Sequence, residues 1–500
     1  MSGAAVLLRR SGARRAHRDG DDAVAPSQDD RLDDDPAART QHEAGRTLTM
    51  RNDHPAPRAA DRGPRLNRRQ LLTGTALGAA TVPLAALGAQ ARPETTAAAG
   101  VPARPVVPGA DRAHADGWAT LRGERVGIIT NPTGVLRNLR NVVDEMHASG
   151  AVDLVGVFGP EHGFRGTAQA GSSEGTFVDE RTGLTVYDAY GAGVSKMTEM
   201  FRAAEVETVV FDIQDVGARF YTYIWTMWTA MQAAVATGSR FVVLDRPNPV
   251  GGTARGPMMT SGFTSGVGAK EIVQAHGMTV GELARFFDGE FLPDVVGERL
   301  ARLDVVEVSG WRRDVTFGGT GLDFVMPSPN MPTPDTALAY PGTCMFEGTN
   351  LSEGRGTTRP FELVGAPFVD HRWAEALTEA DLPGVLFREA YFNPTFSKHA
   401  NTVCGGVQVT VDDPARFDPV RTGVAMLVAA AALYPEFAWR QDSWDPQRPF
   451  WIDKLTGSPR LRQQIDAGAD TDEVVAAWQA ELADFDRRRQ QYLLYRGPRA

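Results

Sequence analysis

Cysteine is scarce in this chain, and its scarcity excludes two classes of protein. Cys344 and Cys404 are the only two among 500 residues, too few for a disulfide scaffold or for a zinc site built from four cysteines. A basic excess is also lacking, because 62 acidic residues outnumber 52 basic ones and the net charge is −10. Nucleic acid is therefore not expected as a partner, since its binding requires a basic face.

Several familiar catalytic and cofactor motifs are missing as well. No G-x-G-x-x-G follows the first expected strand, no Gly-Lys pair offers a phosphate-binding loop, and the H-E-x-x-H motif does not occur. Gly171–Gly175 matches G-x-S-x-G, but a nucleophile elbow needs a strand directly before it, and here a Gly/Ala loop precedes it. We therefore expect no cofactor and disfavour a serine hydrolase.

The first hundred residues have the composition of a leader. Residues 1–66 are rich in Arg, Asp, Ala and Pro without a hydrophobic period, which predicts that they do not fold. Arg68 and Arg69 precede a moderately apolar run at 71–88, and a small-x-small sequence follows at 89–91. This order predicts a twin-arginine-type signal peptide, over about 50–91, within a disordered leader that ends at residue 103.

A transmembrane anchor is the alternative to a cleaved signal. The run is diluted by Gly, Thr and Pro83 and is barely long enough to span a bilayer. We therefore expect no stable membrane anchor after cleavage, and a protein that works in the extracellular, periplasmic or cell-wall space. Because Met50 lies at the usual distance before a twin-arginine motif, we also expect translation to begin there.

From about residue 104 the chain changes to apolar strands that alternate with helices. This alternation predicts an α/β fold in which helices cover both faces of a parallel sheet. The Pro-rich stretch 327–334 breaks the rhythm and predicts a boundary between domains at 104–326 and 327–500. The expected strands are 125–130, 153–158, 184–187, 207–213, 240–244, 303–308 and 406–411. The expected helices are 141–148, 194–204, 221–236, 279–291, 420–433 and 472–492.

Polar residues gather directly after the expected strands, where an open parallel sheet binds its ligands. Turn chemistry alone explains Asn or Asp at such positions, but turns do not need Glu, His or a pair of aspartates. A metal site at Glu161, His162, Asp212 and Asp215 is a further alternative, although no ligand spacing demands it. The candidate residues at these strand ends are Asn131, Glu161, His162, Arg165, Asp212, Asp215, Arg219, Tyr221 and Tyr223.

A second polar cluster lies beyond the predicted boundary, at 347–358. It combines Glu347, Asn350, Glu353 and Arg355 with hydroxyl groups on a Gly-punctuated backbone. Such a surface suits a polar, hydroxyl-rich ligand. A solvated loop is the alternative.

Six segments together resemble one bacterial family, the exo-β-N-acetylmuramidases, formerly a domain of unknown function. The resemblance runs from about residue 125 to the last helix, and the leader lies outside it. It implies a Rossmann-like N-terminal catalytic domain, a smaller C-terminal α/β domain, and an active site in the cleft between them. It also implies release of N-acetylmuramic acid from the non-reducing ends of peptidoglycan fragments, with muropeptides or disaccharides as ligands. The segments are GPEHGFRG at 159–166, FDIQDVGARFYTYIWTM at 211–227, LDRPNPVGG at 244–252, HGMTVGELA at 276–284, PSPNMPT at 327–333 and EGTNLSEGRGTTRPFELVGAP at 347–367.

A glycosidase needs a protonated acid at the leaving oxygen. Glu161 is our candidate, because a carboxyl just past a buried strand can be held protonated, and His162 would orient it or contact the sugar. The second group is open among Glu347, Asp212 and Asp215. Alternatively, the 2-acetamido group of the substrate itself assists, and a carboxylate steadies the acetamide.

The lactyl carboxylate of N-acetylmuramic acid calls for an arginine, and Arg165, Arg219 and Arg355 are the candidates. Asn131, Tyr221, Tyr223, Asn330, Asn350 and Glu353 complete the expected substrate contacts. Two other functions stay open: a non-catalytic muropeptide-binding protein of the cell wall, and a metal-dependent hydrolase that uses the same cleft.

Overall fold

The computed structural model describes residues 105–169 and 171–497. The predicted leader, with Arg68, Arg69 and the signal over 50–91, lies outside these residues.

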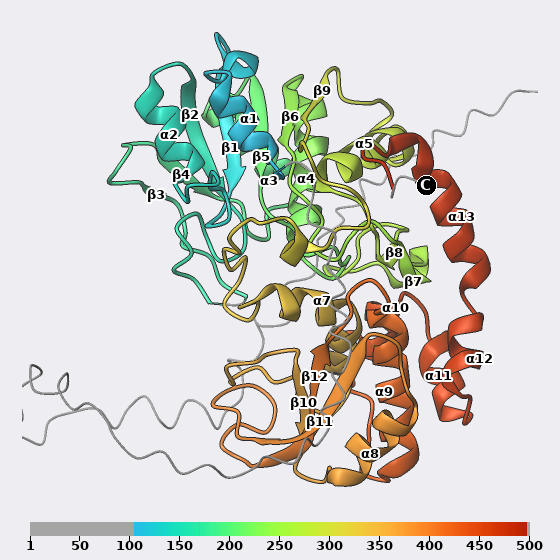
Figure 1. Cartoon of the computed structure of the whole chain (residues 1–500). Coiled ribbons are helices and arrows are strands. Elements are labelled where there is room, and N and C mark those ends of the chain that lie inside the picture. The colour runs from blue at the N-terminus through green and yellow to red at the C-terminus, as the bar shows by residue number, and fades with distance from the viewer. Residues whose placement is uncertain (1–104, 170, 498–500) are drawn as a thin grey trace, which may run out of the picture. The chain divides into compact units, whose positions relative to one another are not determined.

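A seven-stranded sheet is the centre of the larger part of the fold (Figure 1). Its strand order is β3-β4-β2-β1-β5-β6-β9, and every neighbouring pair is parallel except β3 with β4. The predicted parallel sheet is therefore confirmed, with one short antiparallel edge. The strands are β1 Arg125–Thr130, β2 Asp153–Gly159, β3 Phe177–Val178, β4 Thr185–Asp188, β5 Thr208–Asp212, β6 Arg240–Leu244 and β9 Leu303–Val306.

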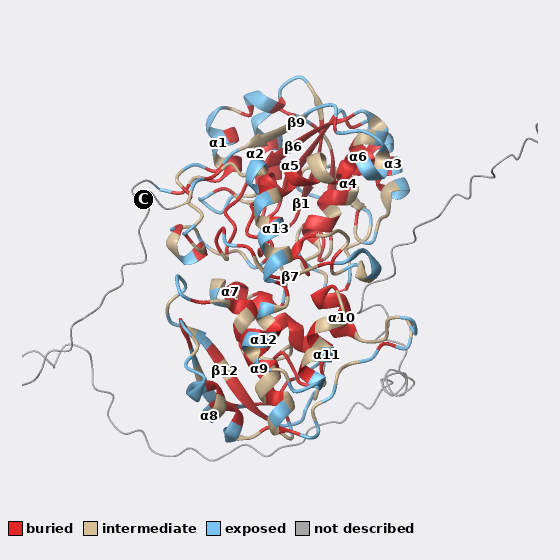
Figure 2. Cartoon of the chain, turned by 90° about the vertical axis from the view of Figure 1, so that its right-hand side faces the viewer, coloured by how far each residue is buried: buried red, intermediate tan, exposed pale blue. Residues whose placement is uncertain are grey.

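Helices cover both faces of this sheet, because successive residues of a strand point to opposite sides. Ile128 belongs to the apolar cluster under α1 and α2, whereas its neighbour Ile129 belongs to the cluster under α3, α4 and α5. β5 and β6 are buried from end to end, and β1 is buried from its second residue on (Figure 2). The helices are α1 Gly109–Ala115, α2 Val142–Ser149, α3 Val194–Ala203, α4 Tyr223–Thr237, α5 Val280–Glu290 and α6 Leu292–Val296.

The aromatic side chains on α4 belong to the core rather than to a sugar platform. Trp225 and Trp228 are buried, and their rings lie 5.7 Å from the ring of Phe287 on α5. They therefore fix α4 against α5, and with it the residues at the start of α4.

A smaller C-terminal domain follows the Pro-rich stretch. Its antiparallel sheet has the order β10-β12-β11, and α7, α8 and α9 share its apolar core. A separate hairpin, β7 with β8, precedes it in the chain. The bounds are β7 Arg255–Met258, β8 Val273–Ala275, β10 Leu363–Ala366, β11 Val385–Phe392, β12 Cys404–Val411, α7 Pro334–Thr343, α8 His371–Glu379, α9 Pro419–Leu433, α10 Trp451–Thr456 and α11 Arg460–Asp466.

The last expected helix, 472–492, is two helices in the structure. α12 spans Thr471–Ala476 and α13 spans Gln479–Arg489, with Trp478 between them. Trp478 packs into the core of the smaller domain, but Phe485 packs into the core of the large sheet, 5.6 Å from the ring of Phe286. The helix breaks where the chain passes from one core to the other, and α13 then runs back toward α5 (Figure 1).

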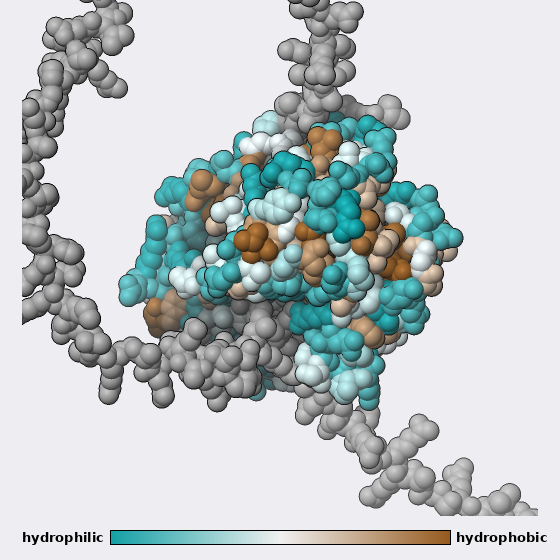
Figure 3. Space-filling model, turned by 90° about the horizontal axis from the view of Figure 1, so that it is seen from below, coloured by the Kyte–Doolittle hydropathy of each residue, from teal (hydrophilic) through white to brown (hydrophobic). Residues whose placement is uncertain are grey.

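The remaining general features place few constraints on function. Cys344 and Cys404 are both buried and free. Among the described residues, no helix has the length and apolar character needed to cross a membrane. Where grey atoms do not cover it, the face in Figure 3 carries scattered hydrophobic side chains among hydrophilic ones, rather than one large apolar patch.

Candidate active site

Four neighbouring strands of the large sheet deliver polar side chains to one edge. β2, β1, β5 and β6 are adjacent and parallel, so their carboxyl ends meet at the same edge of the sheet. Asn131 follows β1, Glu161 follows β2, Asp215 follows β5 and Arg246 follows β6. This edge is the candidate active site.

Glu161 is held by two hydrogen bonds and still reaches solvent. Its Oε1 accepts from the backbone N–H of Gly171 at 2.9 Å, and its Oε2 accepts from the Thr222 hydroxyl at 2.8 Å. Thr222 directly precedes α4. The side chain is 15% exposed. The carboxyl group is therefore fixed in orientation and accessible to a ligand, as a general acid requires.

The loop that carries His162 is strained and closely packed. His162 has a φ of 70° and Gly163 a φ of 80°, and a Cβ on Gly163 would come within 2.2 Å of the Glu174 side chain. The His162 Nδ1 lies 3.1 Å from the carbonyl of Gln169. Because a carbonyl only accepts, Nδ1 carries the proton, and Nε2 faces the Glu161 Oε1 at 3.9 Å. His162 thus lies beside the acid candidate without bonding to it.

Asp215 is buried, and its hydrogen bonds within the described residues all reach one carboxylate oxygen, Oδ2. Its Oδ2 accepts from the backbone N–H of Gly217 at 2.7 Å and lies 3.2 Å from Nε2 of the fully buried His276. The His276 Nδ1 accepts from the backbone N–H of Met278 at 3.2 Å, so Nε2 is the protonated nitrogen and donates to Asp215. The Asp215 Oδ1 is buried without a hydrogen-bond partner in the described part of the chain.

Two tyrosines, Tyr221 and Tyr223, feel the charges of both carboxylates. The rings of Tyr221 and Tyr223 make an edge contact at 5.2 Å. The Tyr223 hydroxyl donates to the carbonyl of Pro327 at 2.5 Å. The Tyr221 hydroxyl is buried, and Ser328 approaches it without completing a hydrogen bond. Burial raises the pKa of Tyr221 far above its ordinary value, and the charges of Glu161 and Asp215 raise it further, so the hydroxyl keeps its proton.

The second polar cluster is a chain of ion pairs in which the carboxylates are buried and the cations are partly exposed. The Arg355 guanidinium donates to Glu347 at 2.8 Å and lies 3.3 Å from Glu353, which also pairs with Lys398 at 2.9 Å. Burial alone would lower the pKa of Arg355, but Glu347 and Glu353 raise it. Burial would likewise raise the pKa of Glu353, but Lys398 and Arg355 lower it. The shifts of Arg355 and Glu353 both favour the charged forms, so these two residues form a charged pair.

Aromatic rings connect this cluster to the edge of the large sheet. The ring of Tyr221 lies 5.8 Å from that of Tyr340 on α7, and Tyr340 lies 4.7 Å from Phe361. The guanidinium of Arg355 stands over the Phe361 ring at 5.1 Å. The charge of Arg355 also lowers the pKa of Tyr221, against the larger effect of burial, which raises it. The two polar clusters predicted separately are thus neighbours in space.

Two of the three arginines proposed for the lactyl group are committed to structural bonds. Arg165 pairs with Asp144 at 3.0 Å and with Asp179 at 2.9 Å. Arg219 is 0% exposed and donates to the carbonyls of Pro257, Ile272 and Leu455, and burial lowers its pKa to about 9. Arg219 is buried, and Arg165 already makes four hydrogen bonds to the two aspartates, whereas Arg355 makes fewer bonds within the protein, so the geometry favours Arg355.

Asp212 is also committed. Its two carboxylate oxygens accept from the Nε and Nη2 of Arg246 at 2.6 and 2.9 Å. Burial raises the pKa of Asp212 above its ordinary value even though Arg246 lowers it. The pair closes the end of β5 against that of β6 and leaves Asp212 without a free oxygen for a sugar.

The three asparagines differ in their surroundings. Asn131 is 0% exposed, and its Oδ1 accepts from the N–H and hydroxyl of Thr133. Asn350 bonds with its amide to the backbone of Glu436 and Ala438, which gives it a structural role. Asn330 is buried in the loop whose Pro327 accepts from Tyr223. Asn131 lies near Tyr223 in space, and Asn330 belongs to the loop to which Tyr223 donates its hydrogen bond.

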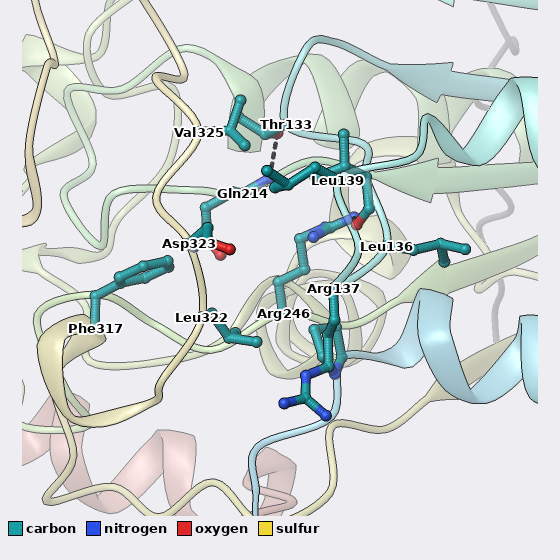
Figure 4. A pocket seen from close by; sticks show the side chains of 12 residues that line it. Thr133, Leu136, Arg137, Leu139, Gln214, Arg246, Phe317, Leu322, Asp323 and Val325 are labelled. Atoms are coloured by element: carbon teal, nitrogen blue, oxygen red, sulfur yellow. Dashed lines mark hydrogen bonds between the residues drawn. The ribbon is translucent and has the colours of Figure 1, made fainter.

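A small pocket opens at the same edge, between the strand ends and a segment that follows β9 (Figure 4). Its volume is about 30 Å³, room for one or two water molecules rather than a sugar ring. Neither Glu161 nor Asp215 lines it. Its walls include Thr133, Gln214, Arg246, Phe317 and Leu322, with the Thr133 hydroxyl accepting from the backbone N–H of Gln214 at 2.9 Å.

Three residues of the site were not among the sequence candidates: Thr222, His276 and Lys398. His276 lies within the segment HGMTVGELA that carried the resemblance, and Thr222 lies between the two tyrosines, so both were within reach of the motif. Lys398 lies far from the other site residues in the sequence, and no motif around it predicts a site residue. Within residues 105–169 and 171–497, no group of three or more His, Cys, Asp or Glu side chains is placed to hold a metal ion.

Comparisons with known proteins agree on one family. Family models described as exo-beta-N-acetylmuramidase NamZ, N-terminal and C-terminal, match residues 126–335 and 338–495. Peptidoglycan beta-N-acetylmuramidase NamZ of Bacillus subtilis (strain 168) is 45% identical over 377 residues, which are 75% of this chain and 88% of that protein.

Two solved structures from Bacteroides fragilis NCTC 9343, both DUF1343 family proteins, have the same fold. The first superimposes with a TM-score of 0.69 at 33% identity and covers 78% of this chain and 99% of its own. The second has a TM-score of 0.63 at 27% identity and covers 79% and 100%.

Proposed function

The chain belongs to the exo-β-N-acetylmuramidase family and is a glycoside hydrolase, and we propose that Glu161 is the general acid with which it releases terminal N-acetylmuramic acid from peptidoglycan fragments. The observation that carries this proposal is how the Glu161 carboxyl group is held and exposed. Both of its oxygens are held, by Gly171 and Thr222, while the side chain is 15% exposed.

The bond to be broken joins the anomeric carbon of the terminal sugar to the oxygen of the next residue. Its cleavage passes through an oxocarbenium-like transition state, and the departing oxygen needs a proton. Glu161 supplies that proton. The Thr222 hydroxyl fits either state of the acid, because it donates to the carboxylate and accepts from the carboxylic acid.

Recognition of the lactyl carboxylate falls to Arg355 on this proposal. Its bonds to Glu347 and Glu353 use only part of its five N–H donors, and its side chain is 23% exposed. The ring of Phe361, under the guanidinium, helps to hold it in place. The substrate would then lie between the sheet edge and the loop of the smaller domain.

Export forms a further part of the proposal, because peptidoglycan lies outside the cytoplasm. A chain begun at Met50 should be exported and shortened near Ala91, and Arg68→Lys with Arg69→Lys should block both events. Immunoblots of cytoplasmic and exported fractions test this. Retention of the unaltered chain in the cytoplasm would contradict it.

The activity is tested with two disaccharides of opposite order. Incubation with β-N-acetylmuramyl-(1→4)-N-acetylglucosamine should release free N-acetylmuramic acid, measured by mass spectrometry. N-acetylglucosaminyl-(1→4)-N-acetylmuramic acid, which carries the other sugar at its non-reducing end, should stay intact. Binding of the first disaccharide without release would instead identify a muropeptide-binding protein.

A further inference from the structure

Among the three candidates for a second carboxylate, Asp215 alone is without a guanidinium partner. Asp212 is bound at both oxygens by Arg246, and Glu347 accepts from Arg355. Within the described residues, the ion-pair partner of Asp215 is His276. Asp215 is therefore the carboxylate whose hydrogen-bonding capacity the protein itself leaves incomplete.

The incomplete capacity lies on one atom. Gly217 and His276 both donate to Oδ2, and Oδ1 is buried with no partner among the described side chains and backbone groups. A buried carboxylate oxygen without a donor is costly, and such atoms in a folded protein point to a ligand or to water. The Tyr221 hydroxyl is a second buried polar atom without a partner, and the charge of Asp215 raises its pKa, after the larger effect of burial.

Asp215 Oδ1 offers an acceptor and the Tyr221 hydroxyl a donor, and together they complement a secondary amide, which has one N–H and one carbonyl. We propose that Asp215 Oδ1 accepts from the N–H of the substrate's 2-acetamido group and that the Tyr221 hydroxyl donates to its carbonyl, so that the acetamide itself attacks the anomeric carbon. This inference rests on the proposed function and concerns the same site. It assigns no nucleophilic role to a protein carboxylate.

The steps balance without any co-reactant besides water. The acetamide oxygen forms a bond to the anomeric carbon while the glycosidic bond breaks, and its electron pair leaves with the departing oxygen, which takes the proton of Glu161. The product is an oxazolinium ion, whose N–H is held by the Asp215 carboxylate. Water then attacks the anomeric carbon and gives a proton to Glu161, and the acetamide is restored. Two displacements at one carbon retain the β configuration.

His276 is a positioning residue in this scheme. It is fully buried, its Nδ1 accepts from Met278, and its Nε2–H donates to Asp215 Oδ2. That bond fixes the orientation of the carboxylate and leaves Oδ1 to the substrate. Arg489 of α13 fixes the same loop by donating to the carbonyls of His276 and Gly277.

The first experiment uses the unaltered enzyme. Nitrophenyl β-muramides that carry N-acetyl, N-fluoroacetyl, N-difluoroacetyl and N-trifluoroacetyl groups are compared by kcat/KM. Fluorine withdraws electrons from the attacking oxygen, so kcat/KM should fall steadily along the series, and proton NMR should show the β anomer as first product. Rates independent of fluorination, or the α anomer first, would overturn the inference while leaving the released sugar, and hence the proposed function, intact.

The second experiment uses variants on the same series. Asp215→Asn should lower kcat/KM on the N-acetyl substrate by about 10²–10³-fold, the usual effect of losing one preorganised electrostatic group. His276→Leu should lower kcat more than it changes KM, and His276→Gln, which keeps an N–H donor, should recover part of the loss. Glu199→Gln, on an exposed side chain of α3, is the matched control. Full activity in Asp215→Asn, or equal losses in both His276 variants, would contradict these assignments.

Discussion

Glu161→Gln separates the proton of the proposed acid from its shape. In the structure Oε1 accepts from the Gly171 N–H at 2.9 Å and Oε2 from the Thr222 hydroxyl at 2.8 Å. The glutamine oxygen can keep the first bond. Its amide N–H can donate to the Thr222 oxygen, which is also an acceptor. The variant should therefore fold and bind substrate as the parent does, and differ only in having no proton to transfer.

The expected loss follows from what that proton contributes. General acid catalysis typically supplies about 10²–10⁴-fold, which at 1.36 kcal/mol per tenfold is about 3–5 kcal/mol of transition-state stabilisation. We expect turnover of the muramyl disaccharide to fall by this factor. A nitrophenyl muramide should suffer less, because nitrophenolate leaves with little help from a proton.

The assay therefore compares the two substrates in the same variant. Thr222→Val is the companion variant, because it removes the hydroxyl donor and leaves the carboxyl, and it should lose about tenfold or less. Near-normal turnover of the disaccharide by Glu161→Gln would refute the argument and make Glu347 the next candidate. Equal losses on both substrates would mean that the residue acts on the sugar rather than on the leaving oxygen.

Three further predictions concern recognition, stability and metals. Arg355→Ala should weaken the muramic substrate relative to an N-acetylglucosaminide by about 1.5–3 kcal/mol, measured as a ratio of kcat/KM, whereas Arg165→Ala should lower the melting temperature and leave that ratio unchanged. Burial raises the pKa of Asp245 to about 7, so between about pH 4, where the unfolded carboxyl loses its proton, and pH 7 the folded chain keeps a proton that the unfolded chain has lost; this contribution to stability is full below that window and gone above pH 7, so the melting temperature relative to that of Asp245→Asn should fall from pH 4 to 7 and level off above it, and parallel curves would contradict it. Turnover should survive a chelator, and a loss restored by one divalent ion would instead indicate a metal-dependent hydrolase.

The order of the fold was predictable because its strands are continuous apolar runs that end in polar residues. Val209–Phe211 is buried on both faces of the sheet, and such a run has few other stable positions. Glu161 could also be identified from the sequence, because it follows such a strand at a position where a turn does not require a glutamate. The break at Trp478 was not predictable, because one helical period runs through it and only the positions of two separate cores divide it.

Arg219 shows why hydrogen-bond partners that are distant in the chain cannot be predicted from the sequence. In the chain it follows a strand end, among residues typical of a binding loop. In the fold its guanidinium donates to the carbonyls of Ile272 and Leu455, and the second of these belongs to α10. A residue whose partners are backbone carbonyls leaves no pattern of side chains to detect. Lys398 is similar, because two of its three acceptors are the carbonyls of Phe346 and Leu351.

Asp212 and Asp215 show that the number of hydrogen-bond partners distinguishes a structural carboxylate from a ligand-binding one better than the residue type does. Asp212 ends β5, Asp215 follows it closely, and both are buried, so the sequence cannot rank them. The fold gives both oxygens of Asp212 to Arg246 but gives Asp215 two donors on a single oxygen. Since buried polar atoms are nearly always paired, the oxygen left over identifies where the protein's own bonding ends and a ligand's begins. By that criterion Asp212 joins two strands, and Asp215 is the residue that we propose contacts the substrate.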